Sequence, residues 1–391
     1  MNLLERATAL LPDDEPARGA MLPELGIALV QLGRLRDADR LLTDAARRAT
    51  ATHDALSESH AVTARFFARV QVDSEAASGE LDGRFATLLE TFTVAGDELG
   101  LSRLYRAEAL VHWLAGQSAK AEAAWMRATR HARRAGDEHG GADALVWLAS
   151  AAHSGPTPVP EAIVRCRRIL GQLRHDRMSQ ALTLRPLASL EAMAGRFDRA
   201  QALLDRATAI VDDLGVSLTS APAHFEAVIA LLRGDGAAAE AALRPGYAHL
   251  EEMGERALLA TTAALVAQAV VLQGRLDEAW RLADVAQEAA AADDLSAQIL
   301  SRSARAQVLA LRGDHAAADR LSAQAVALAA RTDWLQDHGD ALLVRSDVLR
   351  AGGDPEGASA AAGAALELYE RKGSRVAAER ARAALAAGIA A

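Results

Sequence analysis

The stretch "GRLDEAWRLADVA", residues 274–286, contains the pattern that decides the fold. Its first glycine has counterparts along the chain with a regular period of about 39–40 residues. The glycines of this series are Gly116, Gly155, Gly195, Gly234, Gly274, Gly313 and Gly353. A fixed period of this length indicates an array of one repeated structural unit.

Each repeat has the pattern of two helices. After Gly274, the residues Leu276, Ala279, Ala283 and Ala286 are spaced by three and four, which places them on one face of an amphipathic helix. A second marker stands halfway through most of the repeats: Gly136, Gly215, Gly254, Asp294, Asp333 and Gly373, with His175 and Asp176 in one repeat. Because glycine and aspartate tolerate the left-handed backbone conformation, we expect these positions to end helices. Each repeat is therefore predicted to be a helix hairpin that neighbouring hairpins cover.

The turn inside each hairpin has a small residue five positions after the glycine. Examples are "GRLRDA" from Gly33, "GQSAKA" from Gly116 and "GDHAAA" from Gly313. The small residues are Ala38, Ala121, Ala200, Ala239, Ala279, Ala318 and Ala358. A methyl side chain lets two helix axes approach closely, so we expect these alanines to be buried where the helices cross.

This glycine and alanine in a helix-turn-helix resemble the tetratricopeptide repeat, although the period exceeds that family's unit of about 34 residues. The resemblance implies an all-α, right-handed superhelical solenoid of helix hairpins over residues 1–391. Within it we expect a truncated first unit at 1–15, degenerate repeats at 55–100 and 139–175, and a C-terminal capping helix at 375–391. In the second degenerate repeat Pro160 takes the place of the small residue, which the first turn of a helix tolerates.

Composition and charge exclude several classes of protein. The chain has no apolar stretch long enough to span a membrane and no cationic leader, and its one cysteine, Cys166, excludes an internal disulfide. These features predict a cytoplasmic protein in which Cys166 is a small buried hydrophobe, although neighbouring arginines would activate it if it were exposed. The net charge is −9 and acids are interleaved with the basic residues, so we expect no direct binding of nucleic acid.

The sequence contains no recognisable catalytic, metal or cofactor motif. Ala119 and Arg371 precede the only two lysines, Lys120 and Lys372, so no Gly-Lys phosphate loop exists. No His-Glu-x-x-His pair and no Gly-x-Ser-x-Gly elbow occurs. We therefore expect no catalytic residue, no metal ligand and no cofactor.

The resemblance to tetratricopeptide arrays points to a concave surface for binding. In such arrays the first helix of each hairpin lines the groove, which would take a protein or peptide segment or a small effector. The polar residues that the resemblance places there are Arg103, Arg106, Arg185, Ser189, His224, Gln268, Gln307 and Asp347. Each is alternatively an ordinary exposed polar side chain, and the tryptophans Trp113, Trp147, Trp280 and Trp334 are expected to fill the core.

The similarity extends to the chain's ends. The opening "NLLERATALLPDDEPARG" and the close "AALELYERKGSRVAAERARAALA" resemble the C-terminal arm of multidomain signalling ATPases of high-GC bacteria, including LuxR-type regulators and nucleotide-cyclase-linked ATPases. This resemblance implies a non-enzymatic regulatory arm that couples a bound segment or effector to a signalling or transcription-regulating domain. Two alternatives stay open: a free-standing peptide-binding adaptor, and a peptide-regulated, phosphatase-like enzyme on the same repeats.

The first segment predicts an interface. "NLLERATALL" has the pattern of the second helix of a hairpin, and no first helix precedes it. Leu3, Leu4 and Leu10 lie on its apolar face. We expect this face to meet either an upstream domain or a second copy of the chain in a homodimer.

Overall fold

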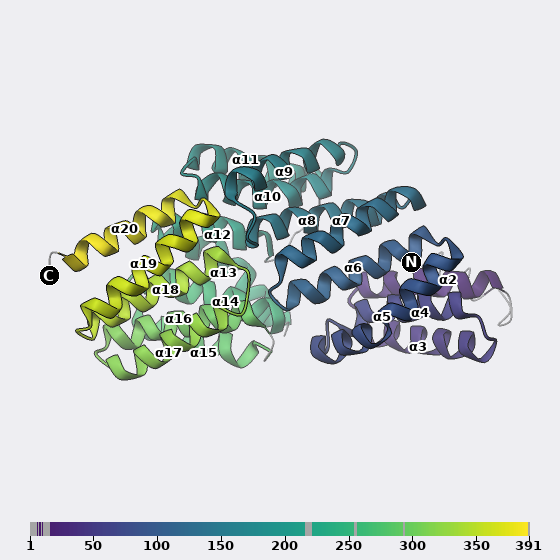
Figure 1. Ribbon diagram of the computed structural model, residues 1–391, viewed down its shortest axis with the longest axis horizontal. Helices are drawn as coiled ribbons and strands as arrows, with labels where there is room; N and C mark the ends of the chain where they lie inside the picture. The colour runs from purple at the N-terminus through teal and green to yellow at the C-terminus, as the bar shows by residue number, and fades with distance from the viewer. Residues whose placement is uncertain are drawn as a thin grey trace. The chain divides into compact units, whose positions relative to one another are not determined.

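The computed structural model describes residues 6, 8, 10, 16–215, 221–253, 256–291 and 294–389. In these ranges the regular structure consists of 19 α-helices (Figure 1). They are α2 (Pro16–Gln31), α3 (Leu35–Ala51), α4 (Ala55–Arg69), α5 (Ser74–Ala95), α6 (Glu98–Leu114), α7 (Ser118–Ala135), α8 (Glu138–Ser154), α9 (Val159–Gln172), α10 (Arg177–Met193), α11 (Phe197–Asp213), α12 (Ala221–Arg233), α13 (Gly236–Met253), α14 (Arg256–Val271), α15 (Leu276–Ala289), α16 (Leu295–Leu311), α17 (His315–Ala329), α18 (Leu335–Ala351), α19 (Pro355–Lys372) and α20 (Arg375–Ile389).

Consecutive helices pack as hairpins. An even-numbered helix packs on the odd-numbered helix that follows it in α2–α3, in α4–α5 and in every pair from α10–α11 to α18–α19. From α10 to α18, each even-numbered helix also packs on the next even-numbered helix, so the first helices of successive hairpins form a continuous layer. The predicted all-α solenoid of tetratricopeptide-like hairpins is therefore confirmed, while the handedness of its superhelix stays a prediction.

The turn glycines end the first helix of most hairpins in one way. Gly33, Gly116, Gly195, Gly234, Gly274, Gly313 and Gly353 have φ angles between 70° and 86°, whereas Gly155, in a predicted degenerate repeat, is not left-handed. In the left-handed turns other than that of Gly116, the amide after the glycine donates to a carbonyl five positions back, as Arg275 does to Val270 at 3.1 Å. This Schellman arrangement needs a left-handed residue, which glycine adopts without a steric penalty.

The small residue of the turn motif is buried in every hairpin that has it. Ala38, Ala121, Ala200, Ala239, Ala279 and Ala318 are 0% exposed and Ala358 is 1% exposed. The expected burial of these alanines is confirmed, while their place at the helix crossing stays a prediction.

The residues at the second turn marker act in two different ways. Gly136, Gly215 and Gly373 are left-handed, as expected, and Gly254 lies outside the described residues. Asp294 has a φ of −73° instead, and its side chain accepts a hydrogen bond from the Ala297 amide at 3.0 Å. The expectation of a left-handed Asp294 was therefore wrong: its carboxylate caps the start of the next helix, where unpaired amides need an acceptor.

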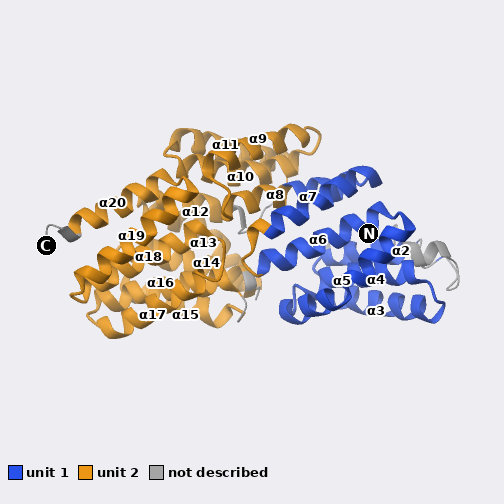
Figure 2. Cartoon of the chain, viewed as in Figure 1, with its two compact units in different colours: residues 1–114, 120–145 blue, residues 115–119, 146–391 orange. Residues whose placement is uncertain are grey.

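The chain divides into two compact units, which Figure 2 colours separately. Unit 1 comprises residues 1–114 and 120–145, and unit 2 comprises residues 115–119 and 146–391. The range 55–100 contains α4 and α5, 139–175 contains most of α8 and all of α9, and 375–391 contains α20. The interpretation of these ranges as degenerate repeats and a cap within one solenoid stays a prediction.

Each unit has an apolar core of its own. In unit 1 the core gathers around Phe66, Leu88 and Phe92. In unit 2 its largest part lies between α12 and α16, around Leu243 and Val266. Within the described ranges no helix has both the length and the apolar character required to cross a bilayer.

Candidate functional site

Polar side chains cross the first-helix layer of unit 2, where apolar packing would be expected. They come from α8, α10, α12 and α14 and are His153, Arg185, Ser189, His224, Glu226 and Thr262. We call these six residues the polar row. Three of them, Arg185, Ser189 and His224, are among the groove residues predicted from the sequence.

Two hydrogen bonds join neighbouring first helices along the polar row. His153 Nε2 lies 2.9 Å from Ser189 Oγ, and His224 Nε2 lies 2.8 Å from Thr262 Oγ1. Burial lowers the pKa of His153 to about 3, with a contribution from Lys372, and burial lowers the pKa of His224 to about 4. Both imidazoles are therefore neutral near pH 7 and act there as hydrogen-bonding groups without charge.

Arg185 is the exception in the row because its charge is not matched by hydrogen bonds. The residue is 5% exposed, and its Nε and Nη1 atoms are buried without an acceptor among the described residues. Burial lowers the pKa of the guanidinium, while the charge of Glu226 acts in the opposite direction. A buried guanidinium with two unused donors is energetically unfavourable unless an acceptor binds it.

A hollow with a volume of about 280 Å³ adjoins the polar row at Glu226. Its wall combines polar groups, including Gln201, Asp205 and Thr208 of α11, with an apolar floor that includes Leu204 and Ile229. Burial raises the pKa of Glu226, Arg185 lowers it and Asp205 raises it. Glu226 therefore stands between the buried arginine and an open space that could hold one side chain of a ligand.

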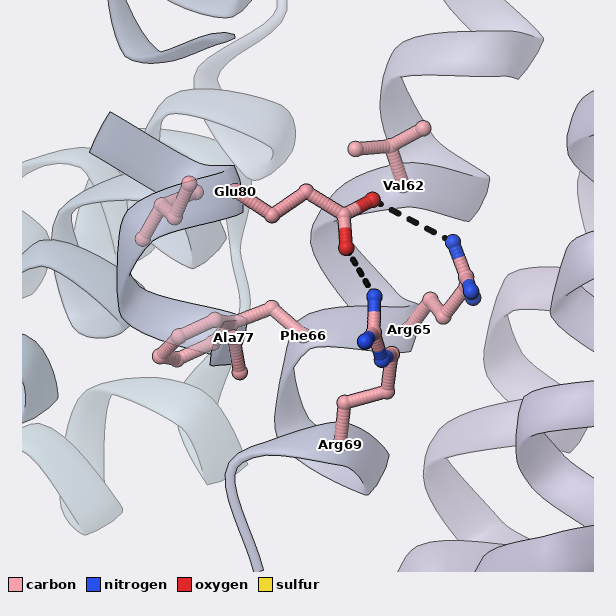
Figure 3. A pocket seen from close by; sticks show the side chains of 7 residues that line it. Val62, Arg65, Phe66, Arg69, Ala77 and Glu80 are labelled. Carbon is pink, nitrogen blue, oxygen red and sulfur yellow. Dashed lines mark hydrogen bonds and ion pairs between the residues drawn. The ribbon is translucent and has the colours of Figure 1, made fainter. Parts of the chain in front are cut away.

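A second pocket, between α4 and α5 in unit 1, is closed by its own side chains (Figure 3). Its volume is about 10 Å³, which leaves room for little more than a water molecule. Glu80 accepts hydrogen bonds from Arg65, at 3.2 Å, and from Arg69. Arg65 also donates to Asp39 at 2.8 Å. This pocket is a structural ion-pair network and offers no binding volume.

The two predicted groove residues of unit 1 have protein partners. Arg103 is 7% exposed and forms an ion pair with Glu24. Arg106 forms an ion pair with Asp143, and its guanidinium lies 5.6 Å from the centre of the Phe67 ring. Both arginines thus connect neighbouring helices of unit 1.

The remaining predicted residues are dispersed. Gln268 and Gln307 are half-buried on α14 and α16, and Asp347 is exposed on α18, 3.3 Å from Arg350. Leu10 is 82% exposed, whereas Leu3 and Leu4 lie outside the described residues. Whether any of these residues meets a partner stays a prediction.

The predicted core residues follow the expectation in part. Cys166 is 0% exposed and burial raises the pKa of its thiol to about 12, so it is a buried, inert residue as predicted. Trp334 is buried, but Trp113, Trp147 and Trp280 are half-buried. Trp280 lies under the guanidinium of Arg305, 4.5 Å from the ring centre.

Sequence reasoning missed His153, Glu226 and Thr262, although a spacing rule would have found Thr262. His224 contacts Thr262 in unit 2, and Arg106 contacts Asp143 in unit 1. His224 precedes Gly234 by the same interval as Arg106 precedes Gly116. Thr262 likewise precedes Gly274 by the same interval as Asp143 precedes Gly155. The same two positions of consecutive first helices therefore meet in both units.

The described part of the chain offers no metal centre. Among the residues that the structure describes, no group of three or more His, Cys, Asp or Glu side chains could hold a metal ion.

Comparison with known proteins supports the fold and no closer relationship. No protein-family model matches the chain, and no curated protein matches its sequence. The solved structure of the apo form of RapI is similar with a TM-score of 0.55 and 11% identity, over 90% of this chain and 98% of that chain. A Rap protein complexed with competence and sporulation factor is similar with a TM-score of 0.50 and 12% identity, over 96% of this chain and 98% of that one. Yeast Tom70 gives a TM-score of 0.37 at 13% identity, over 98% and 91% of the two chains. The hairpins and the two Rap likenesses together define a tetratricopeptide-like helical-repeat protein.

Proposed function

We propose that this chain is a recognition module that binds a protein segment across the polar row of unit 2, with a carboxylate of that segment held by Arg185. The observation that carries the proposal is the buried guanidinium of Arg185, whose Nε and Nη1 have no acceptor among the described residues. A carboxylate accepts two parallel hydrogen bonds from a guanidinium, which no other common protein group does as well.

The surroundings of Arg185 favour a ligand that replaces Glu226 as its counter-charge. The Glu226 carboxyl lines the hollow. Because burial raises its pKa, its charged form is destabilised there, and displacing it from Arg185 costs little free energy. The guanidinium itself is covered, so binding requires rearrangement of the side chains around Glu226. The hollow then takes the residue next to the bound carboxylate.

The similar fold of a Rap protein complexed with competence and sporulation factor is consistent with ligand binding by such an array. We further propose that the bound segment regulates a signalling or transcription-regulating domain, as the resemblance to arms of signalling ATPases implies, and that the chain itself has no catalytic activity. A free-standing adaptor would use the same binding step without the output domain. Hydrolysis of p-nitrophenyl phosphate by the purified chain would instead support the phosphatase-like alternative.

The test is selection of short random peptides on the immobilised protein, followed by affinity measurement for the enriched peptides. We expect the enriched peptides to share an aspartate, a glutamate or a free C-terminal carboxylate, and Arg185→Met to weaken their binding by about 10- to 100-fold. Arg177→Met is the matched control, because Arg177 lies on the same helix α10 but is exposed and paired with Asp213. Enrichment without carboxylates, or equal affinity for Arg185→Met and wild type, would refute the proposal.

A further inference from the structure

Segments of unit 2 that lie far apart in the sequence are joined by direct hydrogen bonds. The contacts link positions separated by 214 to 220 residues. On one side are Gly116, Ser118 and Ala119 together with residues 152–157, and on the other are Asp333, Trp334 and Lys372. We call this set of contacts the clasp.

The first half of the clasp is a helix cap supplied from a distance. The Asp333 carboxylate accepts from the Ser118 amide at 2.9 Å and from the Ala119 amide at 2.8 Å, at the start of α7. In α13, α17 and α19 the aspartate after the turn glycine supplies the cap, as Asp314 does for α17, whereas α3, α11 and α15 have an arginine there and no side-chain cap. In the α7 turn that position is Gln117, and Asp333 supplies the acceptor for the helix amides. Trp334 Nε1 adds a bond to Ser118 Oγ at 2.9 Å.

The second half of the clasp is a buried ammonium group. Lys372 is 0% exposed, and its Nζ donates to the carbonyls of Gly155, Thr157 and Ala152 at 2.6, 2.9 and 3.2 Å. Asp337 on α18 and Asp333, just before α18, face this ammonium. Cys166 on α9 and His153 on α8 also lie close to it. All three protons of the ammonium therefore have acceptors, which offsets part of the cost of its burial.

The clasp joins segments whose helices also pack on other helices of the chain. On its two sides, α9 packs on α10, and α19 packs on both α18 and α20. Opening the clasp breaks no helix, but it costs the hydrogen bonds and the close packing of Gly373 on Pro160 and of Gly116 on Thr332. Burial of the charged groups opposes these contacts, since it lowers the pKa of Lys372 to about 8 and raises the pKa of Asp337 to about 7. Such opposing terms are what a two-state element requires.

One residue connects the clasp to the polar row. His153 lies between Ala152 and Gly155, whose carbonyls bind Lys372, and its side chain bonds to Ser189. Ser189 is one helical turn after Arg185 on α10. A shift of the C-terminal end of α8 thus moves His153, the hydrogen-bond partner of Ser189 in the polar row.

We propose that the clasp is a conformational switch of unit 2: it opens and closes as one element and, through His153, changes the geometry of the polar row. The opening itself is independent of any ligand. Its coupling to a ligand rests on the proposed function and is reciprocal, so a segment bound at Arg185 shifts the clasp as much as the clasp shifts its affinity.

The first test measures opening by the distance between two spin labels. Ala115→Cys and Arg331→Cys place labels at exposed positions on the two sides of the clasp, and buried Cys166 does not compete for the reagent. We expect the Lys372→Met, Asp333→Ala variant to give a longer and broader distance distribution with unchanged helicity. The matched control is Lys120→Met, Asp314→Ala, which removes the other, exposed lysine and a cap within one hairpin. An unchanged distribution in the clasp variant would overturn the proposal.

The second test uses the unaltered chain and stands even where the clasp variant fails to fold. The amides of Ser118, Ala119 and Asp333 donate to acceptors across the clasp. We expect them to exchange hydrogen together, at least about 10-fold faster than the amides of buried α14. Exchange of these amides at the rate of the α14 core, through global unfolding alone, would contradict a separate opening.

The third test addresses coupling with a carboxylate peptide selected on the wild-type chain. We expect the clasp variant to change the affinity of that peptide by at least about fivefold, and the peptide to alter the label distance in the wild type. Equal affinities would overturn the coupling. If no peptide is selected, the proposed function fails while the label distances and hydrogen exchange still decide whether the clasp opens.

Discussion

Replacing Gly116 by alanine tests the long-range contact on which the clasp depends. Gly116 and Gly313 both end a first helix with a positive φ, of 70° and 86°. A Cβ at Gly313 would meet nothing within 4 Å, whereas a Cβ at Gly116 would lie 2.6 Å from Thr332 Cγ2 and 3.0 Å from Thr332 Cβ. Thr332 cannot easily rotate away, because its Oγ1 donates to Ala329 O and accepts from the Trp334 amide.

The two substitutions share one cost and differ in another. The left-handed backbone costs alanine about 1–2 kcal/mol, and the reduced freedom of the unfolded chain returns about 0.4–1 kcal/mol. We therefore expect Gly313→Ala to lower the free energy of unfolding by about 1 kcal/mol. Overpacking against Thr332 adds about 1–3 kcal/mol, so the total loss for Gly116→Ala is about 2–4 kcal/mol.

Urea unfolding followed by far-ultraviolet circular dichroism measures both losses. Thr332→Ser removes Cγ2 but keeps the hydroxyl, so in this background Gly116→Ala should lose most of its additional cost. Equal losses for Gly116→Ala and Gly313→Ala, or no recovery with Thr332→Ser, would show that Thr332 does not lie against Gly116 in solution.

Four further outcomes can be checked separately. Ala279→Leu should cost about 1–3 kcal/mol in thermal unfolding, because Ala279 is 0% exposed, and an unchanged melting temperature would remove it from the helix crossing. The pKa of His224 is about 4 in the fold against 6.5 when exposed, so its contribution, about 3 kcal/mol, is present above pH 6.5 and lost as pH falls toward 4. His224→Gln should flatten that part of the stability-against-pH curve, and a curve as steep as wild type would contradict this. The double substitution Arg103→Ala and Arg106→Ala should destabilise unit 1 by about 1–3 kcal/mol. Unchanged stability together with loss of peptide binding would instead show that both residues line a binding groove. Cys166 should react with a thiol reagent only on unfolding, since burial raises its pKa to about 12, and rapid labelling of the native chain would refute its burial.

The candidate site was predicted only in part, and the residues explain why. Arg185, Ser189 and His224 were selected because they are polar and lie on first helices, and the structure places them together in the polar row. Arg103 and Arg106 met the same criterion, yet both form ion pairs with other helices. The sequence predicts the helix face on which a residue lies. The partner of a polar side chain depends instead on which neighbouring helix presents an acceptor.

The sequence by itself determined the repeating unit of this protein. The periodic glycine fixes where a first helix ends, and the alanine five positions later fixes how closely the second helix crosses it. Both are local effects of backbone conformation and side-chain size, so they can be read one repeat at a time. Only the tertiary structure decided that Asp333 caps α7 and that Lys372 binds the carbonyls of residues 152–157. These contacts depend on the summed rotation of all the hairpins between the two segments, and a small change in each hairpin would move their ends apart.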